Sequence, residues 1–367
     1  MQMRALAGLF DRVSIVVPII ERPPGAGQSA LAGPGMSVLP LAPLCRRLSL
    51  RRLLFVPWLL FNLPRMIRGF LRADAVHAPI PGDIGTIGMV MAQLFHKPLF
   101  VRYCGNFQWI RTRAERFWRW FMERFAGGRT VVLATGSDEQ RPSVKNPRIK
   151  WVFSTTLTDS DLEKRCRPRR LSTDRTLRLI SVCRQEPKKG TALVIEALPL
   201  IRKHCRVHLD VVGSGSALPA LQNLAERVAE GSVTFHGQKS RAEVLELMEA
   251  ADIFCFPTSS SEGFPKAPLE AMACGLPLVA TPVSALETML AQGAGVQVDK
   301  ASGLVVAQAV IELADPSTYE KASKSAVDFA RAHSLECWQD AIRQILVETW
   351  GAVGKGHLVN MSSPPLS

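Results

Sequence analysis

The sequence predicts an α/β protein of two domains, and three observations support this. At 367 residues the chain is long enough for two domains of ordinary size. Its second half alternates short apolar runs with helical stretches, an order typical of βαβ units and a parallel sheet. Because 47% of its residues are hydrophobic and 21% are charged, it can bury substantial cores, which excludes disordered and fibrous classes.

In the second half, five runs have the composition of buried strands, and four stretches between them have helical periodicity. The expected strands are Leu177–Val182, Val207–Val212, Ser232–His236, Ile253–Pro257 and Leu278–Thr281. The expected helices are Thr191–Lys203, Ala217–Glu230, Arg241–Ala250 and Pro268–Cys274. Ligands of such sheets bind at the carboxyl ends of the strands, so we expect a site in the loops that follow them.

The first half is less regular but also suits an α/β domain. Strands are expected at Val13–Ile19, Pro98–Tyr103 and Thr130–Ala134, with a loop and helix over Gly82–Phe95. The remaining predictions are a Gly/Pro/Ala-rich loop, a polar linker and a helical end, over Glu21–Pro43, Asp159–Arg175 and Ser317–Trp350. We therefore expect an N-terminal domain over 1–172, a C-terminal domain over 173–350 and a frayed tail over 351–367.

The net charge of +13 is divided unevenly. Residues 1–150 hold 22 Lys or Arg and 8 Asp or Glu, whereas residues 151–367 hold 23 and 24. A uniformly basic nucleic-acid coat is therefore disfavoured, and one face that meets an anionic partner is favoured. Cys45–Ala73 and Arg111–Arg129 mix arginine with large apolar residues, which suits an anionic membrane surface. The alternative is a solvated helix face whose aromatics, such as Trp120, Phe121 and Phe125, are core.

Cysteine usage and hydropathy indicate a cytoplasmic protein, and the two basic segments add the expectation of a peripheral position on the inner face of the membrane. The eight cysteines have neither CxxC spacing nor a zinc-type pattern with histidine, which indicates reduced thiols. The N-terminus reaches Asp11 before any long apolar stretch, unlike a signal peptide. The longest uncharged apolar run, Leu53–Phe61, has nine residues, against about 20 in a transmembrane helix.

The most informative window runs from Ser259 to Pro277. We expect a loop and then a helix that starts at Pro268, where the missing N–H of proline is harmless. The backbone N–H groups of Gly263–Ala267 would then form an anion site at the helix N-terminus. Glu262 in the loop and Glu270 in the first turn are suited to sugar hydroxyls. Either glutamate alone also suits an ordinary helix start.

Two other loops follow predicted strands. Arg184 and Lys189 would converge after Leu177–Val182, where two cations can hold a diphosphate and stabilise it as it leaves. Alone, this pair could equally be a solvated turn. The Gly213-Ser-Gly loop has the form of a dinucleotide motif, but Leu218 stands where the third glycine belongs. A tight turn near a phosphate is the better interpretation.

Together these segments resemble the retaining glycosyltransferases of family 4, which have the GT-B fold of two Rossmann-like domains facing a cleft. The resemblance covers about Leu177–Leu286. The matching motifs are Glu262-Gly-Phe-Pro…Glu270-Ala-Met-Ala-Cys-Gly-Leu-Pro, Arg184…Lys189-Gly190, Val212-Gly-Ser-Gly and Phe235-His-Gly-Gln.

The resemblance implies a nucleotide diphospho-sugar donor, UDP- or GDP-type, on the C-terminal domain. It implies transfer with retention of configuration, without a metal or cofactor, to a sugar, lipid-linked or polysaccharide acceptor. Arg184, Lys189 and Glu262 would be the catalytic residues, Glu270 would bind the ribose, and the backbone at His236–Gln238 would flank the base. The implied donor-binding residues are Gly213, Gly237, Gly263, Phe264, Pro265, Lys266, Ala267 and Glu270. The last helix would cross back to the first domain.

Asp159-Ser160-Asp161 spells the DxD motif by which another glycosyltransferase architecture bridges a metal. No convincing strand precedes it, and it opens a short helical run over Leu162–Arg165. Asp and Ser are ordinary caps at such a position. We therefore expect no metal site there.

The N-terminal half departs from the family pattern. The family opens with a strand and a Gly-rich loop, whereas here Leu6–Arg12 leads directly into the first predicted strand. We therefore expect an N-terminal domain without its first strand: the start is truncated or misassigned, or this branch lacks the loop. Cys104 stands where the family often has histidine. By position, the acceptor-side candidates are Asp83, Arg102 and Asn106, against an ordinary role as loop residues.

The function that we expect is sugar transfer in polysaccharide or glycolipid biosynthesis. Two alternatives stay open. One is a scaffold that binds nucleotide sugars without transfer. The other is a basic nucleic-acid-binding protein, although the sequence shows no recognisable nucleic-acid module.

Overall fold

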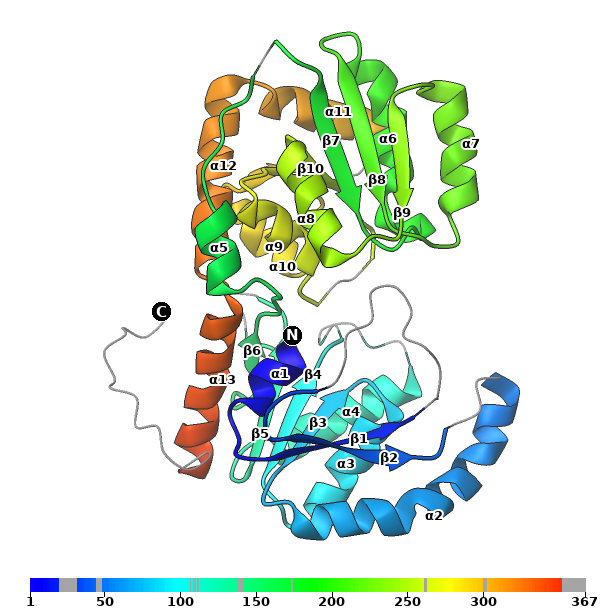
Figure 1. Cartoon of the computed structure of the whole chain (residues 1–367), viewed down its shortest axis with the longest axis vertical. Coiled ribbons are helices and arrows are strands. Elements are labelled where there is room, and N and C mark those ends of the chain that lie inside the picture. Colours follow the sequence, from blue (N-terminus) through cyan, green and yellow to red (C-terminus); the bar gives the residue numbers. More distant parts are fainter. Residues whose placement is uncertain are drawn as a thin grey trace.

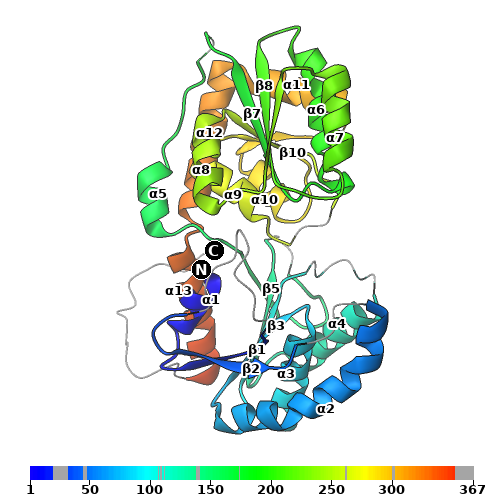
Figure 2. The same ribbon diagram turned by 45° about the vertical axis from the view of Figure 1, so that its right-hand side comes forward.

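The protein has two α/β domains, one above the other, in a computed structural model (Figure 1). The structure describes residues 1–19, 32–43, 48–105, 107, 110, 112–137, 141–172, 174–260, 263–299 and 302–351. The domains are joined along one side by helical segments in both ribbon views (Figures 1 and 2). Each domain carries parallel strands, so the predicted fold class is confirmed.

The C-terminal domain is built on a six-stranded parallel sheet with the order β12-β11-β10-β7-β8-β9. Its strands are β7 (Leu177–Val182), β8 (Val207–Val212), β9 (Val233–Gly237), β10 (Ile253–Phe256), β11 (Leu278–Ala280) and β12 (Gly295–Gln297). Its helices include α6 (Thr191–Ile201), α7 (Leu218–Val228), α8 (Arg241–Ala250), α9 (Lys266–Ala273), α10 (Ala285–Ala291) and α11 (Gly303–Leu313). Buried apolar clusters cover both faces of this sheet, as a parallel sheet requires.

The predicted strands and helices of this half are confirmed, β7, β8 and α8 with the predicted bounds. Sequence reasoning missed α10, β12 and α11. Strand β12 has only three residues, none of them buried, so it has no apolar run to reveal it.

The N-terminal domain has a four-stranded parallel sheet with the order β3-β4-β5-β6 and a separate parallel pair, β1-β2. Its strands are β1 (Val13–Pro18), β2 (Met36–Leu41), β3 (Val76–Ile80), β4 (Leu99–Tyr103), β5 (Thr130–Thr135) and β6 (Lys150–Val152). Its helices are α1 (Gln2–Ala7), α2 (Leu48–Arg72), α3 (Asp83–Leu94) and α4 (Arg113–Phe125). The chain thus passes from α1 into β1, the order expected from the sequence.

One prediction in this half is wrong. Part of the predicted loop Glu21–Pro43 is strand β2, which pairs in parallel with β1 from Val13↔Met36 to Pro18↔Leu41. Gly33-Pro-Gly, just before β2, is typical of a turn and favoured the loop prediction. Strand β2 forms because its backbone pairs with β1. Residues 20–31 of that stretch lie outside the described residues.

The predicted linker packs into the fold. Its first residues form α5 (Asp159–Arg165), which contains the predicted helical run Leu162–Arg165 but begins earlier, with Thr158 as the N-cap in place of Asp159 or Ser160. Leu162 and Cys166 are buried in the core cluster of the C-terminal domain, and so is Leu157 just before them. These residues therefore pack with the C-terminal domain although they precede the predicted boundary at 172.

The predicted helical end Ser317–Trp350 is two helices, α12 (Pro316–Arg331) and α13 (Leu335–Trp350). The break falls where Ser334 caps α13 by accepting a hydrogen bond from the Cys337 amide at 3.0 Å. Helix α12 lies on the C-terminal domain, whereas α13 lies along the N-terminal one (Figures 1 and 2). Trp338, Ile342 and Leu346 of α13 are fully buried against apolar residues of α1, β4 and β5.

No helix in the described part of the chain is both long and apolar enough to span a bilayer.

We predict that Trp338→Ala lowers the free energy of unfolding by about 3–5 kcal/mol, because it leaves a large cavity between α13 and the N-terminal sheet. Val347→Ala, on the same helix but 39% exposed, should change it by no more than about 0.5 kcal/mol. Urea unfolding followed by circular dichroism measures both. Similar losses for the two variants would show that α13 is not held through Trp338.

Candidate functional site

The loop after β7 carries the two predicted cations. Arg184 is exposed, and Lys189 is half-buried, with its Nζ 5.8 Å from the centroid of the Phe256 ring. Lys189 ends a 3₁₀ turn, and Gly190 then adopts a left-handed conformation (φ +81°) before α6 begins at Thr191. A Cβ at Gly190 would lie 2.1 Å from the Pro257 carbonyl oxygen, so only glycine lets this loop approach the end of β10. The loop therefore holds both cations at the carboxyl end of the sheet.

Gln185, which sequence reasoning missed, holds this loop in place through side-chain hydrogen bonds. Its side chain is fully buried and donates hydrogen bonds to the carbonyl oxygens of Val212 (2.9 Å) and Cys183 (3.3 Å). It also accepts one from the Thr191 hydroxyl at 2.8 Å. One amide group thus joins the end of β7, the end of β8 and the start of α6. In the sequence Gln185 lies between Arg184 and Glu186, a setting that is typical of a solvated turn.

The glycines of the loop after β8 allow this loop to pack closely against the loop after β7. A Cβ at Gly213 would lie 1.9 Å from the Cys183 carbonyl oxygen, and one at Gly215 would lie 2.3 Å from the Gln185 carbonyl oxygen. The Gly213 amide also donates to the Gly237 carbonyl oxygen at 2.7 Å. The three loops after β7, β8 and β9 are therefore packed together, as a tight turn near a ligand requires.

A β-bulge shapes the segment expected to flank a base. The register between β8 and β9 shifts so that Val211 pairs with Phe235 but Val212 pairs with Gly237, which leaves His236 as the extra residue. His236 Nε2 lies 2.7 Å from Oδ1 of the buried Asp210, whose other oxygen accepts from Arg178 at 2.7 Å. Burial alone would raise the pKa of Asp210, but these hydrogen bonds outweigh it and hold the pKa below its usual value.

The loop before α9 touches both domains. A Cβ at Gly263 would lie 3.2 Å from the Thr135 carbonyl oxygen at the end of β5. Phe264 is buried, and its ring stacks 5.9 Å from that of His333, which lies between α12 and α13. Burial lowers the pKa of His333, which favours the neutral imidazole in this aromatic contact. Glu262 lies outside the described residues.

Helix α9 begins earlier than predicted. Pro265 is its N-cap and Lys266 its first residue, so Pro268 is the third residue and Glu270 lies in the second turn. The extended backbone of Pro265 (φ −74°, ψ 125°) sets this start. Glu270 therefore lies away from the helix terminus.

Glu270 is oriented by partners from two other segments. Its Oε1 accepts hydrogen bonds from Thr156 Oγ1 at 2.6 Å and from Arg241 Nε at 3.2 Å. Arg241 also binds Asp161 at 2.9 Å, which places the second aspartate of the DxD segment in a structural ion pair. Asp161 caps α5 as well, by accepting from the Thr158 amide. No cluster of residues suited to a metal ion occurs among the residues that the structure describes.

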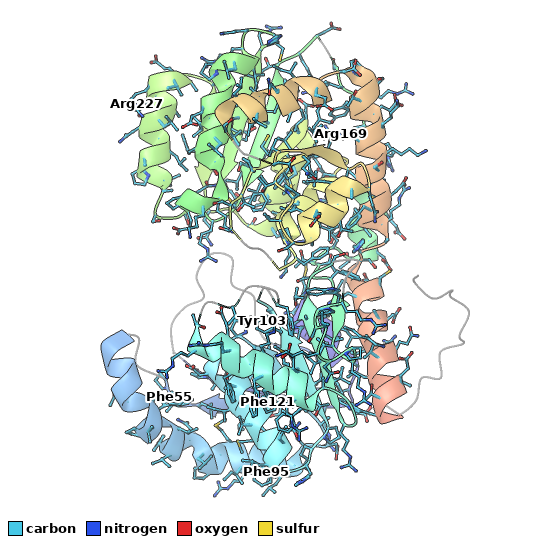
Figure 3. All side chains as sticks on the ribbon, turned by 180° about the vertical axis from the view of Figure 1, so that it is seen from behind. Phe55, Phe95, Tyr103, Phe121, Arg169 and Arg227 are labelled. Carbon is cyan, nitrogen blue, oxygen red and sulfur yellow. The ribbon has the colours of Figure 1, made fainter. Side chains whose placement is uncertain are left out.

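On the N-terminal side, Asp83 is the first residue of α3, at the carboxyl end of β3. Arg102 lies in β4 and is buried beneath α13, with its Cζ 5.4 Å from the centroid of the Trp338 ring. Tyr103 ends β4 at the edge of the domain that faces the other domain (Figure 3), and the exposed Cys104 follows it. Asn106 lies outside the described residues.

We predict different outcomes for alanine at two glycines with similar backbone angles. Gly231 (φ +71°) has open space around its Cα, so Gly231→Ala adds only backbone strain, about 1–2 kcal/mol. Gly190→Ala adds the clash with Pro257 and should lose roughly 1–3 kcal/mol more. Chemical denaturation of both variants gives the difference. Equal losses would mean that the contact between the loops after β7 and β10 does not constrain residue 190.

Comparison with known proteins identifies the C-terminal segment. Residues 176–316 match the family model described as Glycosyl transferases group 1. The phosphatidyl-myo-inositol mannosyltransferase of Mycobacterium tuberculosis is 36% identical over 109 residues, which is 29% of this chain and 28% of that protein. An amylovoran biosynthesis glycosyltransferase of Erwinia amylovora is 32% identical over 122 residues, 31% of this chain and 30% of that protein. The chain spans less than a third of the length of these curated relatives.

Solved structures resemble the chain over most of its length. Anabaena HepE in complex with UDP and glucose has a TM-score of 0.64 at 18% identity, covering 85% of this chain and 86% of that one. Sucrose-phosphate synthase from Thermosynechococcus elongatus has a TM-score of 0.67 at 17% identity, covering 95% and 92%. At such identities the likeness shows the fold alone. Residues 176–316 therefore resemble a glycosyl transferases group 1 domain, within a chain that has the GT-B fold.

Proposed function

We propose that this chain is a retaining glycosyltransferase that moves a sugar from a nucleotide diphospho-sugar to a hydroxyl acceptor. The observation that carries the proposal is the convergence of loops at the carboxyl end of the β7–β10 sheet. There Gln185 and Gly190 hold Arg184 and Lys189 beside the start of α6. The segment matches the group 1 family, and the Anabaena neighbour was solved with UDP and glucose. We infer a UDP- or GDP-type donor for this chain.

Each side chain of the site then has a role. Arg184 and Lys189 hold the diphosphate, and the Gly237 segment, shaped by the bulge at His236, lies beside the base. The backbone from Gly263 to Ala267, with Glu262, holds the sugar and the nearer phosphate. Both described hydrogen bonds to Glu270 end on Oε1, so its Oε2 is the oxygen that accepts from the ribose hydroxyls.

Catalysis in this site consists of positioning and charge stabilisation. The acceptor oxygen bonds to the anomeric carbon while the bond from that carbon to the phosphate oxygen breaks. The leaving diphosphate takes the acceptor proton, and configuration is retained. Lys189, Arg184 and the N-terminus of α6 stabilise the charge that develops on the diphosphate. Because these groups are cationic, the proposal requires neither a metal nor a cofactor.

The outer helices of the N-terminal domain support a membrane-surface role for it. Helix α2 runs along the outer edge of the domain (Figures 1 and 2), and Leu60 and Phe61 on it are 63% and 64% exposed. On α4, Phe121 is core, but Trp120 is 56% exposed. Exposed apolar residues beside arginines suit the plane of an anionic bilayer. We infer a cytoplasmic enzyme, peripheral on the inner face, with a lipid-linked or polysaccharide acceptor.

The donor class is testable by thermal unfolding in EDTA with UDP, GDP, ADP, TDP and their sugars. A ligand at 100 times its Kd adds about 2.7 kcal/mol, which should raise Tm by roughly 5–10 °C. We expect one nucleotide family to do so. Lys189→Ala should abolish the shift, whereas Lys188→Ala, a loss of the same charge at an exposed neighbour, should keep it.

A shift that survives in Lys189→Ala would contradict the proposed diphosphate site. No shift with any nucleotide would contradict the proposed function.

Membrane contact is testable by sedimentation with vesicles. We expect binding to phosphatidylglycerol vesicles but not to phosphatidylcholine vesicles, and weaker binding in high salt because surface charge is screened. The double variant Leu60→Ser with Phe61→Ser should lose binding, whereas Val347→Ser, an exposed apolar residue on α13, should keep it. Equal binding by both variants would exclude the outer face of α2.

A further inference from the structure

Arg241 is placed by the way in which α8 begins. Ser240 is the N-cap of this helix, and its side chain accepts a hydrogen bond from the Glu243 amide. The Glu243 carboxylate in turn accepts one from the Ser240 amide at 2.9 Å. This capping box fixes the first turn of the helix, and Arg241 is the first residue of that turn. Arg241 thus follows shortly after Gly237, whose segment lies beside the base in the proposed function.

The guanidinium of Arg241 bridges two carboxylates. Its Nη2 donates to Asp161 Oδ2 at 2.9 Å, and its Nε donates to Glu270 Oε1 at 3.2 Å. Burial alone would raise the pKa of Asp161, but hydrogen bonds from Thr158 and Arg241 outweigh it and lower the pKa, so this carboxylate stays ionised. Because a guanidinium is planar, two hydrogen bonds through different nitrogens fix its orientation as well as its position.

Thr156 holds the same carboxylate oxygen from another segment, the chain between β6 and α5. Its Oγ1 donates to that oxygen at 2.6 Å. The residues before and after it, Thr155 and Leu157, are both fully buried. The Thr155 carbonyl oxygen accepts from Gln2 Nε2 at 3.0 Å, and the Leu157 carbonyl oxygen accepts from the Leu335 amide at 2.6 Å. The hydroxyl is therefore supplied by a segment that α1 and α13 hold in place.

These two donors fix the rotation of the Glu270 carboxylate, because both of them end on its Oε1. In the described part of the chain, no hydrogen bond ends on Oε2. A carboxylate accepts through both oxygens, and one that is already held loses little rotational freedom when a ligand binds. A hydroxyl that reaches Oε2 is therefore bound more tightly than by a glutamate that is free to rotate.

We propose that Arg241 and Thr156 are positioning residues that make the site selective for a ribonucleotide over a 2′-deoxyribonucleotide. The inference rests on the proposed function, in which Glu270 Oε2 accepts from the ribose hydroxyls. A 2′-deoxy nucleotide lacks one of these hydroxyls, and an acceptor held rigidly for a hydroxyl discriminates against a ligand without it. Neither Arg241 nor Thr156 touches the nucleotide in this arrangement, since both act through Glu270.

The test compares the Kd of UDP with that of 2′-deoxy-UDP, and of GDP with that of 2′-deoxy-GDP, by calorimetric titration of the full chain. For the nucleotide that binds, we expect a preference for the ribose form of about tenfold or more, the value of one hydrogen bond to a charged group. Arg241→Gln should reduce this preference to about threefold or less, by weakening the ribose form more than the deoxy form. Arg175→Gln, at another arginine of this region that is paired with an aspartate, Asp252, is the matched control and should keep the preference.

A second pair of variants tests the hydroxyl of Thr156. Thr156→Val removes the hydroxyl with little change in shape, and should lower the preference by about twofold to tenfold, the value of a neutral hydrogen bond. Thr156→Ser keeps the hydroxyl and should keep the preference. A preference that is unchanged in Thr156→Val, or equally reduced in Thr156→Ser, would contradict the positioning role.

The outcomes distinguish failure of this inference from failure of the proposed function. If neither UDP nor GDP binds, the proposed donor and this inference fail together. If one of them binds but its deoxy form binds equally well, or if Arg241→Gln weakens both forms equally, only the positioning role is wrong. Glu270→Ala should abolish the preference, and adding Arg241→Gln to it should change Kd no further, because Arg241 acts through the glutamate. A further loss in the double variant would show that Arg241 contacts the nucleotide directly and would overturn the inference.

Discussion

The crossing of α13 to the N-terminal domain is the contact on which the site depends. It brings Trp338 into the N-terminal core, where the ring also supports Arg102. At the start of the crossing, His333 stacks on Phe329 and Phe264, so the loop before α9 is packed against the break between α12 and α13. One helix thus aligns the two sheets so that the carboxyl end of β4 meets the start of α9.

Within the C-terminal domain, the site depends on backbone groups approaching closely. Gly190 and Gly213 each lie against a carbonyl oxygen where a methyl group would not fit, and Gln185 binds the same loops through its amide. These contacts are made by uncharged groups, beside the two cations Lys189 and Arg184. In the proposed function the cations stabilise a diphosphate, and the uncharged residues that hold the loops in place provide the preorganisation that such charge stabilisation requires.

Much of this could be predicted from local sequence patterns. Strands β7 and β8 are continuous apolar runs, and their bounds follow from composition alone. The motif around Glu270 predicts a loop and helix at the sheet end. Strand β2 could not be predicted, because its order comes from pairing with β1. The partners of Glu270 could not be predicted either, because they come from segments 29 and 114 residues away along the chain, a separation that no local pattern encodes.

The measurement that tests the account most directly is turnover. The full chain would be incubated with a panel of nucleotide sugars, with and without a lipid extract, and the products read by mass spectrometry and NMR. The account predicts release of one nucleoside diphosphate and a product whose anomeric configuration is retained, both lost in Lys189→Ala. Donor binding without release under any condition would contradict it, and would identify a binding scaffold instead.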